Sequence, residues 1–127
     1  MIEAAIRSIL IADDTVKALT TRVYPVALPQ SPQYPLILYT KITGMRDHHL
    51  QGPNGRAHPR FQIEAWSKTY TEAKTLADAI REALDGYSGT AAGTKIGSCL
   101  IESEQDIYES EIEVYRVIQD YFIWHEE

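Results

Sequence analysis

The sequence has a single cysteine, Cys99, among 127 residues, so no disulfide can form within the chain. It has no apolar run near the roughly 20 residues that cross a bilayer, and its N-terminus lacks the pattern of a signal peptide. Basic residues are few, because 12 Lys and Arg face 18 Asp and Glu and give a formal net charge of -6. Binding to nucleic-acid phosphates depends on Lys and Arg. We therefore expect a protein of the reducing cytoplasm that binds neither membranes nor specific nucleic acid.

Signatures of catalysis are missing as well. The candidate nucleophiles lie in no nucleophile elbow and in no cysteine–histidine signature. They are Ser67, Ser98, Ser103 and Cys99. The glycines between Gly86 and Gly97 are not followed by Gly-Lys-Ser/Thr, so they form no phosphate loop. We expect no catalytic residue, no bound cofactor and no enzymatic activity.

What is present is the composition of one globular domain. With 44% hydrophobic and 24% charged residues, the chain resembles an ordinary soluble fold. Its length fits a single domain, residues 1–127, that buries roughly two thirds of its unfolded surface without disulfides or metals. We expect one hydrophobic core.

The clearest local pattern joins a strand directly to a helix, from Arg60 to Gly86. Alternation in residues 60–66 predicts a strand with one apolar face. Thr69 and Glu72 form a capping box that begins an amphipathic helix, and Gly86 ends it. The apolar stripe of this helix comprises Ala73, Leu76, Ala77, Ile80, Leu84 and Tyr87.

The N-terminal part predicts a short helix followed by an extended connection. Apolar residues recur at helical spacing from Ile2 to Ile11, and Asp13 or Asp14 can cap a further turn. Four prolines between Tyr24 and Pro35 each remove an amide donor, which favours an extended strap on the surface.

Three more segments predict strands. Residues 36–43 are rich in β-branched and aromatic side chains, and we expect them to pair with residues 60–66 as an antiparallel hairpin. The connection between these strands, residues 44–59, contains glycines and prolines and is expected to project as a mobile loop. Residues 95–101 and 114–124 predict two further strands, joined by an acidic segment.

The order of these elements predicts an α+β fold. We expect a two-layer sandwich with a mainly antiparallel sheet of about four to five strands, and one long and one short helix packed on it. The last strand is longer than a small sheet needs, so its end is expected to be available to another subunit.

Taken together, these segments resemble the tail completion proteins, also called tail terminator or neck proteins, of tailed phages, prophages and gene transfer agents. The resemblance covers nearly the whole chain. It rests on the segments MIEAAIRSILIAD, RVYP, LPQ, PLILYTKITG, RFQIEAWSKTYTEAKTLADAIREALDG and YRVIQDYFIWH.

The resemblance implies a non-enzymatic virion structural protein of the tail or neck, present in the host cytoplasm during assembly. Its working form would be a homo-oligomeric ring, usually of six subunits, that terminates the tail tube and joins the tail to the head. The implied partners are other copies of the chain, the tail tube protein and the head connector proteins. DNA would pass through the ring without specific binding.

Two other side-chain groups were weighed as binding sites. The first group contains imidazole and carboxylate side chains, which suit zinc as ligands. The glycines and prolines near these side chains in the sequence offer no rigid framework, so we expect no metal site. These residues are Asp47, His48, His49 and His58. Aromatic residues can stack on bases, but without a basic groove we expect sheet core and interface contacts instead. They are Tyr115, Tyr121, Phe122 and Trp124.

Charge is distributed unevenly between two segments. Residues 102–113 hold six acids and no base, whereas residues 41–60 hold four bases and one acid. Two interpretations remain open: solvated surfaces that keep the protein soluble, or complementary patches that set register between neighbouring subunits. An alternative placement of the same acids is along a channel for DNA. On the interpretation as patches, the subunit or tail interface comprises Arg46, Arg56, Arg60, Glu104, Asp106, Glu109 and Glu111.

The interface hypothesis makes a prediction. Reversing Arg56 and Arg60 to glutamate should weaken assembly, and lysines at Glu109 and Glu111 should partly restore it. Two alternative functions also stay open. One is a head-to-tail adaptor elsewhere in the neck; the other, from a different class, is a small cytoplasmic ligand-binding or enzymatic α+β dimer. The latter needs a concave pocket with converging polar groups, for which the sequence has no pattern.

Overall fold

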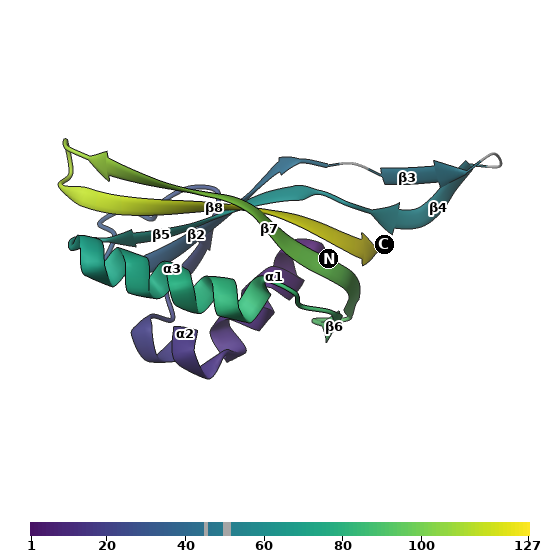
Figure 1. Cartoon of the computed structure of the whole chain (residues 1–127), viewed down its shortest axis with the longest axis horizontal. Coiled ribbons are helices and arrows are strands. Elements are labelled where there is room, and N and C mark those ends of the chain that lie inside the picture. The colour runs from purple at the N-terminus through teal and green to yellow at the C-terminus, as the bar shows by residue number, and fades with distance from the viewer. Residues whose placement is uncertain (45, 50–51) are drawn as a thin grey trace.

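A computed structural model of the protein describes residues 1–44, 46–49 and 52–127, and the side chains outside residues 45–54. The helices of this part are α1 (Ile2–Ala12), α2 (Asp14–Leu19) and α3 (Tyr70–Leu84). Its strands are β1 (Val23–Pro25), β2 (Leu36–Thr43), β3 (Arg46–His49), β4 (Gly52–Ala57), β5 (Arg60–Ser67), β6 (Gly89–Ala91), β7 (Thr94–Glu109) and β8 (Val114–Glu126). Figure 1 shows the helices gathered on one side of a long twisted sheet.

The strands form one mixed sheet with β8 in a central position. β8 pairs antiparallel with β5 on one side and with β7 on the other. β2 pairs antiparallel with β5, which confirms the predicted hairpin, and β1 adds to β2 in parallel. β6 pairs with the start of β7, while β4 pairs with β3 and with the end of β8.

The main core lies between the sheet and the helices. Alternation along β5 places Phe61 and Ile63 on this face, and both are completely buried. The apolar stripe of α3 packs against them through Leu76 and Ile80, which are also completely buried. We call this the helix-covered face and the opposite side of the sheet the helix-free face.

The caps of the helices agree with the sequence patterns. The Asp13 carboxylate accepts a hydrogen bond from the backbone N–H of Val16 at 3.0 Å, so Asp13 begins α2. Thr69 Oγ1 accepts a bond from the N–H of Glu72 at 3.2 Å and so begins α3. The other half of the capping box differs, because the Glu72 carboxylate accepts a bond from the Ser67 hydroxyl instead of the Thr69 amide.

Gly86 ends the unit that contains α3. Its φ of 82° lies in the left-handed region, which glycine adopts readily because it has no Cβ. Its N–H donates to the carbonyl of Cys99 at 2.7 Å. The end of the helix is thereby tied to β7.

The proline-rich strap covers part of the helix-free face. A second buried cluster lies there, made by Leu36, Leu38, Trp66 and Val114. Tyr24, Leu28 and Tyr34 from the strap pack against it. The fold therefore has the predicted two layers, plus a partial cover of irregular chain on the second face of the sheet.

The expected loop at residues 44–59 is mostly paired strand, so this part of the prediction was wrong. β3 and β4 form an antiparallel pair that continues the β2–β5 hairpin beyond the helices (Figure 1). Glycine and proline have low strand preference, but Arg56 and Ala57 gain partners in Glu126 and His125 of β8. Residues 45, 50 and 51 lie outside the described part.

The acidic segment also differs from the prediction, because most of it belongs to β7. Pairing with β8 extends this strand to Glu109, where the sequence had predicted an end near Ile101. Backbone pairing outweighs the low strand preference of Glu and Asp. Both sides of β8 are thus paired within the chain, so its length is used internally and its end is not left open for another subunit. The strands therefore exceed the four to five predicted, and the described helices number three.

Candidate interaction surfaces

Two predicted interface acids contact the helix layer. Lys74 of α3 lies 3.1 Å from Glu104 and 3.2 Å from Asp106, both on β7. The Tyr70 hydroxyl donates to Asp106 at 2.7 Å. These groups tie the N-terminal half of α3 to the edge strand, so their charge already has a partner within the subunit.

A buried amide strengthens this contact. Gln119 of β8 is completely buried and donates from Nε2 to the Ala77 carbonyl at 2.9 Å and to Glu104 at 2.8 Å. Its Oε1 accepts a bond from the Tyr121 hydroxyl at 2.7 Å. The hydrogen bond from Gln119, with the contact to Lys74, holds the pKa of Glu104 below its ordinary value.

The helix-free face carries a second set of paired charges. Arg116 of β8 contacts both Glu64 and Glu109, and its guanidinium lies 4.7 Å from the centre of the Trp66 ring. Glu64 is only 3% exposed, so this ion pair is partly buried. Glu109, a third predicted interface acid, is therefore engaged within the chain.

Arg60 belongs to a neighbouring group on the same face. Its guanidinium lies 2.9 Å from Asp120, to which the Ser103 hydroxyl also donates at 3.1 Å. The sequence had placed Arg60 at a subunit interface, whereas the structure gives it an internal partner. The proposed reversal of Arg60 to glutamate would therefore disturb the sheet as well as any interface.

Two of the predicted interface residues, Glu111 and Arg56, are exposed at opposite ends of the β7–β8 hairpin. Glu111 is exposed in the turn between β7 and β8 and makes no hydrogen bond or ion pair within the described part. Arg56 is exposed on β4 at the other end of the β7–β8 hairpin. The side chain of Arg46 lies outside the described residues, as do those of Asp47, His48 and His49.

The turn that joins β7 to β8, residues 110–113, forms what we call the hairpin tip. It presents Ile112, which is 47% exposed, between Glu111 and Glu113. Three tyrosines stand beside the turn, with ring centres 4.7 Å apart for Tyr108 and Tyr115 and 5.7 Å apart for Tyr70 and Tyr115. Exposed aromatic and aliphatic groups with several acids thus gather at this end of the sheet.

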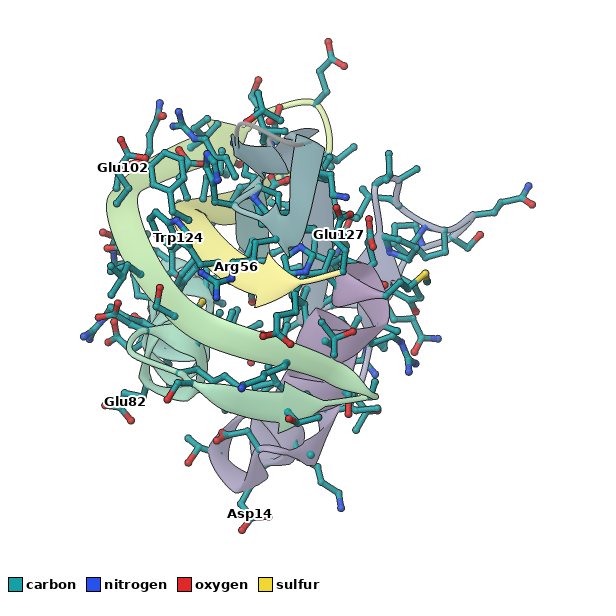
Figure 2. The ribbon with its side chains drawn as sticks, turned by 90° about the vertical axis from the view of Figure 1, so that its right-hand side faces the viewer. Asp14, Arg56, Glu82, Glu102, Trp124 and Glu127 are labelled. Atoms are coloured by element: carbon teal, nitrogen blue, oxygen red, sulfur yellow. The ribbon has the colours of Figure 1, made fainter. Side chains whose placement is uncertain are left out.

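The opposite end contains a groove of about 270 Å³, which we call the terminal groove. It is lined by Arg56, Ala57, Lys95, Gly97, Trp124, His125 and Glu126. Figure 2 views this end directly and shows Arg56 and Trp124 close to the end of β8. Gly97 contributes no side chain to the groove, and a Cβ built there would make only an ordinary contact with the Trp124 carbonyl, at 3.6 Å.

Exposed apolar side chains continue from the terminal groove onto the helix-free face. Trp124 is 38% exposed, and its ring centre lies 6.0 Å from that of Phe122 and 6.1 Å from that of His58. Leu100, which is 49% exposed, pairs with Phe122 across the strands. The sequence predicts interface contacts from the C-terminal aromatics, but no sequence pattern connects these residues to Lys95 or Gly97.

Three further findings concern metal binding, membrane spanning and the reactivity of the cysteine in the described residues. No group of three His, Cys, Asp or Glu side chains in that part is placed to hold a metal ion. No helix among the described residues has both the length and the apolar character needed to cross a membrane. Burial raises the pKa of the Cys99 thiol to about 12, with the nearby charge of Asp85 contributing, so this thiol is a weak nucleophile.

Comparison with known proteins identifies the family of the chain. Over residues 4–126, the sequence matches the model of the family described as tail completion protein gp17. A chain in the solved structure titled "Virion of native gene transfer agent (GTA) particle" shares the fold, with a TM-score of 0.81 at 19% identity. That match covers 98% of this chain and 94% of the other. No curated protein matches the sequence. Since the family model spans nearly the whole sequence, the chain belongs to the tail completion protein gp17 family and is a phage tail structural protein.

Proposed function

We propose that this protein terminates the tail tube and joins the tail to the head connector, acting as one subunit of a ring without enzymatic activity. The family match over residues 4–126 is the observation that carries the proposal. A ring of six subunits is the form that the family resemblance implies. In this role the protein assembles in the host cytoplasm and remains in the neck of the virion.

The surfaces of the subunit support a role in assembly. Its two ends expose apolar and aromatic side chains, of which Trp124 and Ile112 are examples, beside charged groups of different sign. Contiguous exposed apolar groups rimmed by charge are typical of protein contacts. Because the groups at the two ends differ, each subunit has two distinct surfaces, which is what a closed ring of identical copies requires.

Surface recognition would also stop tube growth. A ring that binds the last layer of the tube through one face covers the surface on which the next layer would add. Its other face is then free to receive the connector. This mechanism needs no reacting group, so a small α+β domain is sufficient for it.

A binding experiment with separate components tests the role. The protein is immobilised and offered the cognate tube protein and the cognate head connector in separate reactions. Termination and joining predict specific binding of both. Binding of the connector alone would favour an adaptor elsewhere in the neck, and binding of neither would contradict a role in the neck altogether.

A further inference from the structure

We propose that the hairpin tip of one copy docks into the terminal groove of a second copy, with Ile112 as the apolar anchor. This inference rests on the proposal that the protein assembles into a ring, and it identifies the residues through which neighbouring copies meet. It replaces the broader charge patches suggested by the sequence with two small surfaces.

Ion pairs within the subunit leave only some of its charged side chains available for contact with a neighbouring copy. Glu104 and Asp106 are held by Lys74, Glu109 contacts Arg116, and Arg60 contacts Asp120. Of the six acids in residues 102–113, Glu102 interacts electrostatically with Arg60, and Glu111 and Glu113 lie in the tip without an ion pair in the described part. The charge available for a neighbour is therefore concentrated at the tip.

The terminal groove has the complementary chemistry. Lys95, an exposed cation, lines the groove together with Arg56 and one acid, Glu126, and the partly exposed side chain of Trp124 provides apolar contact area. A volume of about 270 Å³ is much more than the roughly 30 Å³ that one water occupies, so the groove accepts a side chain such as Ile112. Opposite charges at its rim would orient the incoming tip.

Geometry makes the contact intermolecular. The tip and the groove lie at opposite ends of the β7–β8 hairpin, because Glu109 pairs with Val114 at one end and Ile96 with His125 at the other (Figure 1). Eleven residue steps along β8 at about 3.3 Å separate these ends by roughly 36 Å. A subunit cannot fill its own groove. A tip-to-groove contact between copies is heterologous, so repetition of it forms a ring when the rotation closes.

Single-surface variants test this contact through the mass of the protein in solution, measured by light scattering. Ile112→Asp removes the anchor, and the double substitution Arg56→Glu with Lys95→Glu reverses the groove. We expect each to lower the association constant by about tenfold or more, equivalent to about 1.4 kcal/mol. The matched controls are Ile42→Asp, at an exposed apolar residue of β2, and Lys17→Glu, at an exposed lysine of α2; both should assemble as the wild type does.

Mixing the two variants gives the more specific test. The tip variant retains a groove and the groove variant retains a tip, so one productive contact remains between them. At a concentration where each variant alone is monomeric and the wild type assembles, we expect an equimolar mixture to form 1:1 dimers. A mixture that stays monomeric beside an assembling wild type would overturn the proposal.

Cross-linking checks the same contact without relying on loss of function. In a Cys99→Ala background, Ile112→Cys and Lys95→Cys in one chain should form disulfides between copies on oxidation and give a ladder of covalent multimers. Ile112→Cys combined with Glu82→Cys, on the exposed side of α3, should give no ladder. Circular dichroism of every variant establishes that it is folded.

The outcomes separate this contact from the ring itself. A wild-type multimer whose mass and cross-linking are unaffected by the tip and groove substitutions overturns the docking contact and leaves the ring intact. A wild-type protein that stays monomeric at all concentrations, and also on isolated tubes, overturns both the ring and the contact.

Discussion

The ammonium nitrogen of Lys74 on α3 lies 3.1 Å from a carboxylate oxygen of Glu104 on β7. Asp106 shares the same ammonium group at 3.2 Å. This contact crosses from the helix layer to the edge of the sheet, so acids that looked available to a neighbour serve to hold α3 in place. Which charges remain for assembly is thus decided by packing within the subunit.

Removing this cation should cost little stability. In Lys74→Met we expect the free energy of unfolding to fall by about 0.5–1 kcal/mol, because the three side chains are each roughly a third exposed and solvent screens such pairs. Urea unfolding measures the change, with Lys17→Met on α2 as the control. A loss above about 3 kcal/mol would mean that the contact holds the fold to a degree the exposure does not account for.

Stability should depend on acid pH through the same carboxylates. Gln119 and Lys74 hold the pKa of Glu104 below its ordinary value of 4.5, and the Tyr70 hydroxyl and Lys74 hold that of Asp106 below 3.8. A carboxylate with a lower pKa in the folded state stabilises the fold above the unfolded pKa and loses this effect as the pH falls through the folded pKa. We therefore expect the free energy of unfolding to decrease as the pH drops below about 4.5.

Substituting the carboxylate isolates its share of this dependence. Glu104→Gln should flatten the curve of unfolding free energy against pH in the acid range, whereas Glu82→Gln on the exposed side of α3 should leave its slope as in the wild type. Denaturant unfolding at a series of pH values provides the curve. The same slope in Glu104→Gln and the wild type would show that the pairing does not favour the ionised form.

The partly buried ion pair on the helix-free face should respond differently to single and double substitution. Arg116→Met leaves Glu64, which is 3% exposed, without its cation, and we expect a loss of about 3–5 kcal/mol. Replacing both residues by methionine removes the orphaned charge, so much of the loss should be recovered. A double-mutant cycle from thermal or urea unfolding checks this; additive losses would contradict the coupling.

The buried thiol should be almost inert in the folded protein. Cys99 is 1% exposed, and burial raises its pKa to about 12. We expect alkylation near neutral pH to be at least about 100-fold slower than in the unfolded chain, because the thiolate is the reacting form. Labelling with iodoacetamide, with and without denaturant, measures both rates. Rapid reaction of the folded protein would mean that β7 separates readily from the end of α3 and exposes Cys99 to solvent.

Local signals in the sequence predicted much of the architecture. The helix cap at Asp13, the start of α3 at Thr69 and its end near Gly86 follow from side-chain chemistry within a few residues. The pairing of β2 with β5 was predicted from the strand patterns of two segments that are neighbours in the order of elements. Long-range pairing was less visible. The acids of β7 have low strand preference, and only their pairing with β8 keeps residues 102–109 in the sheet.

The candidate surfaces were harder to predict for the same reason. Unequal charge in two segments predicted Arg56 and Glu111 as interface residues, and this stays a prediction. Sequence alone could not show that Glu104 and Glu109 have cations within the subunit. Lys95 was also missed. It carries no pattern of its own and reaches Arg56 and Trp124 only because β7 and β4 flank the same end of β8.

The central claim, that this protein terminates a tail tube, is tested most directly by the length of tubes grown from the cognate tube protein. Purified tube protein is polymerised with increasing amounts of the chain, and tube lengths and ends are measured by electron microscopy. Added protein should cap one end of each tube and halt growth there, so that mean length falls as the ratio of protein to tube protein rises. Tubes that keep growing to the same length, with bare ends at every ratio, would contradict the claim.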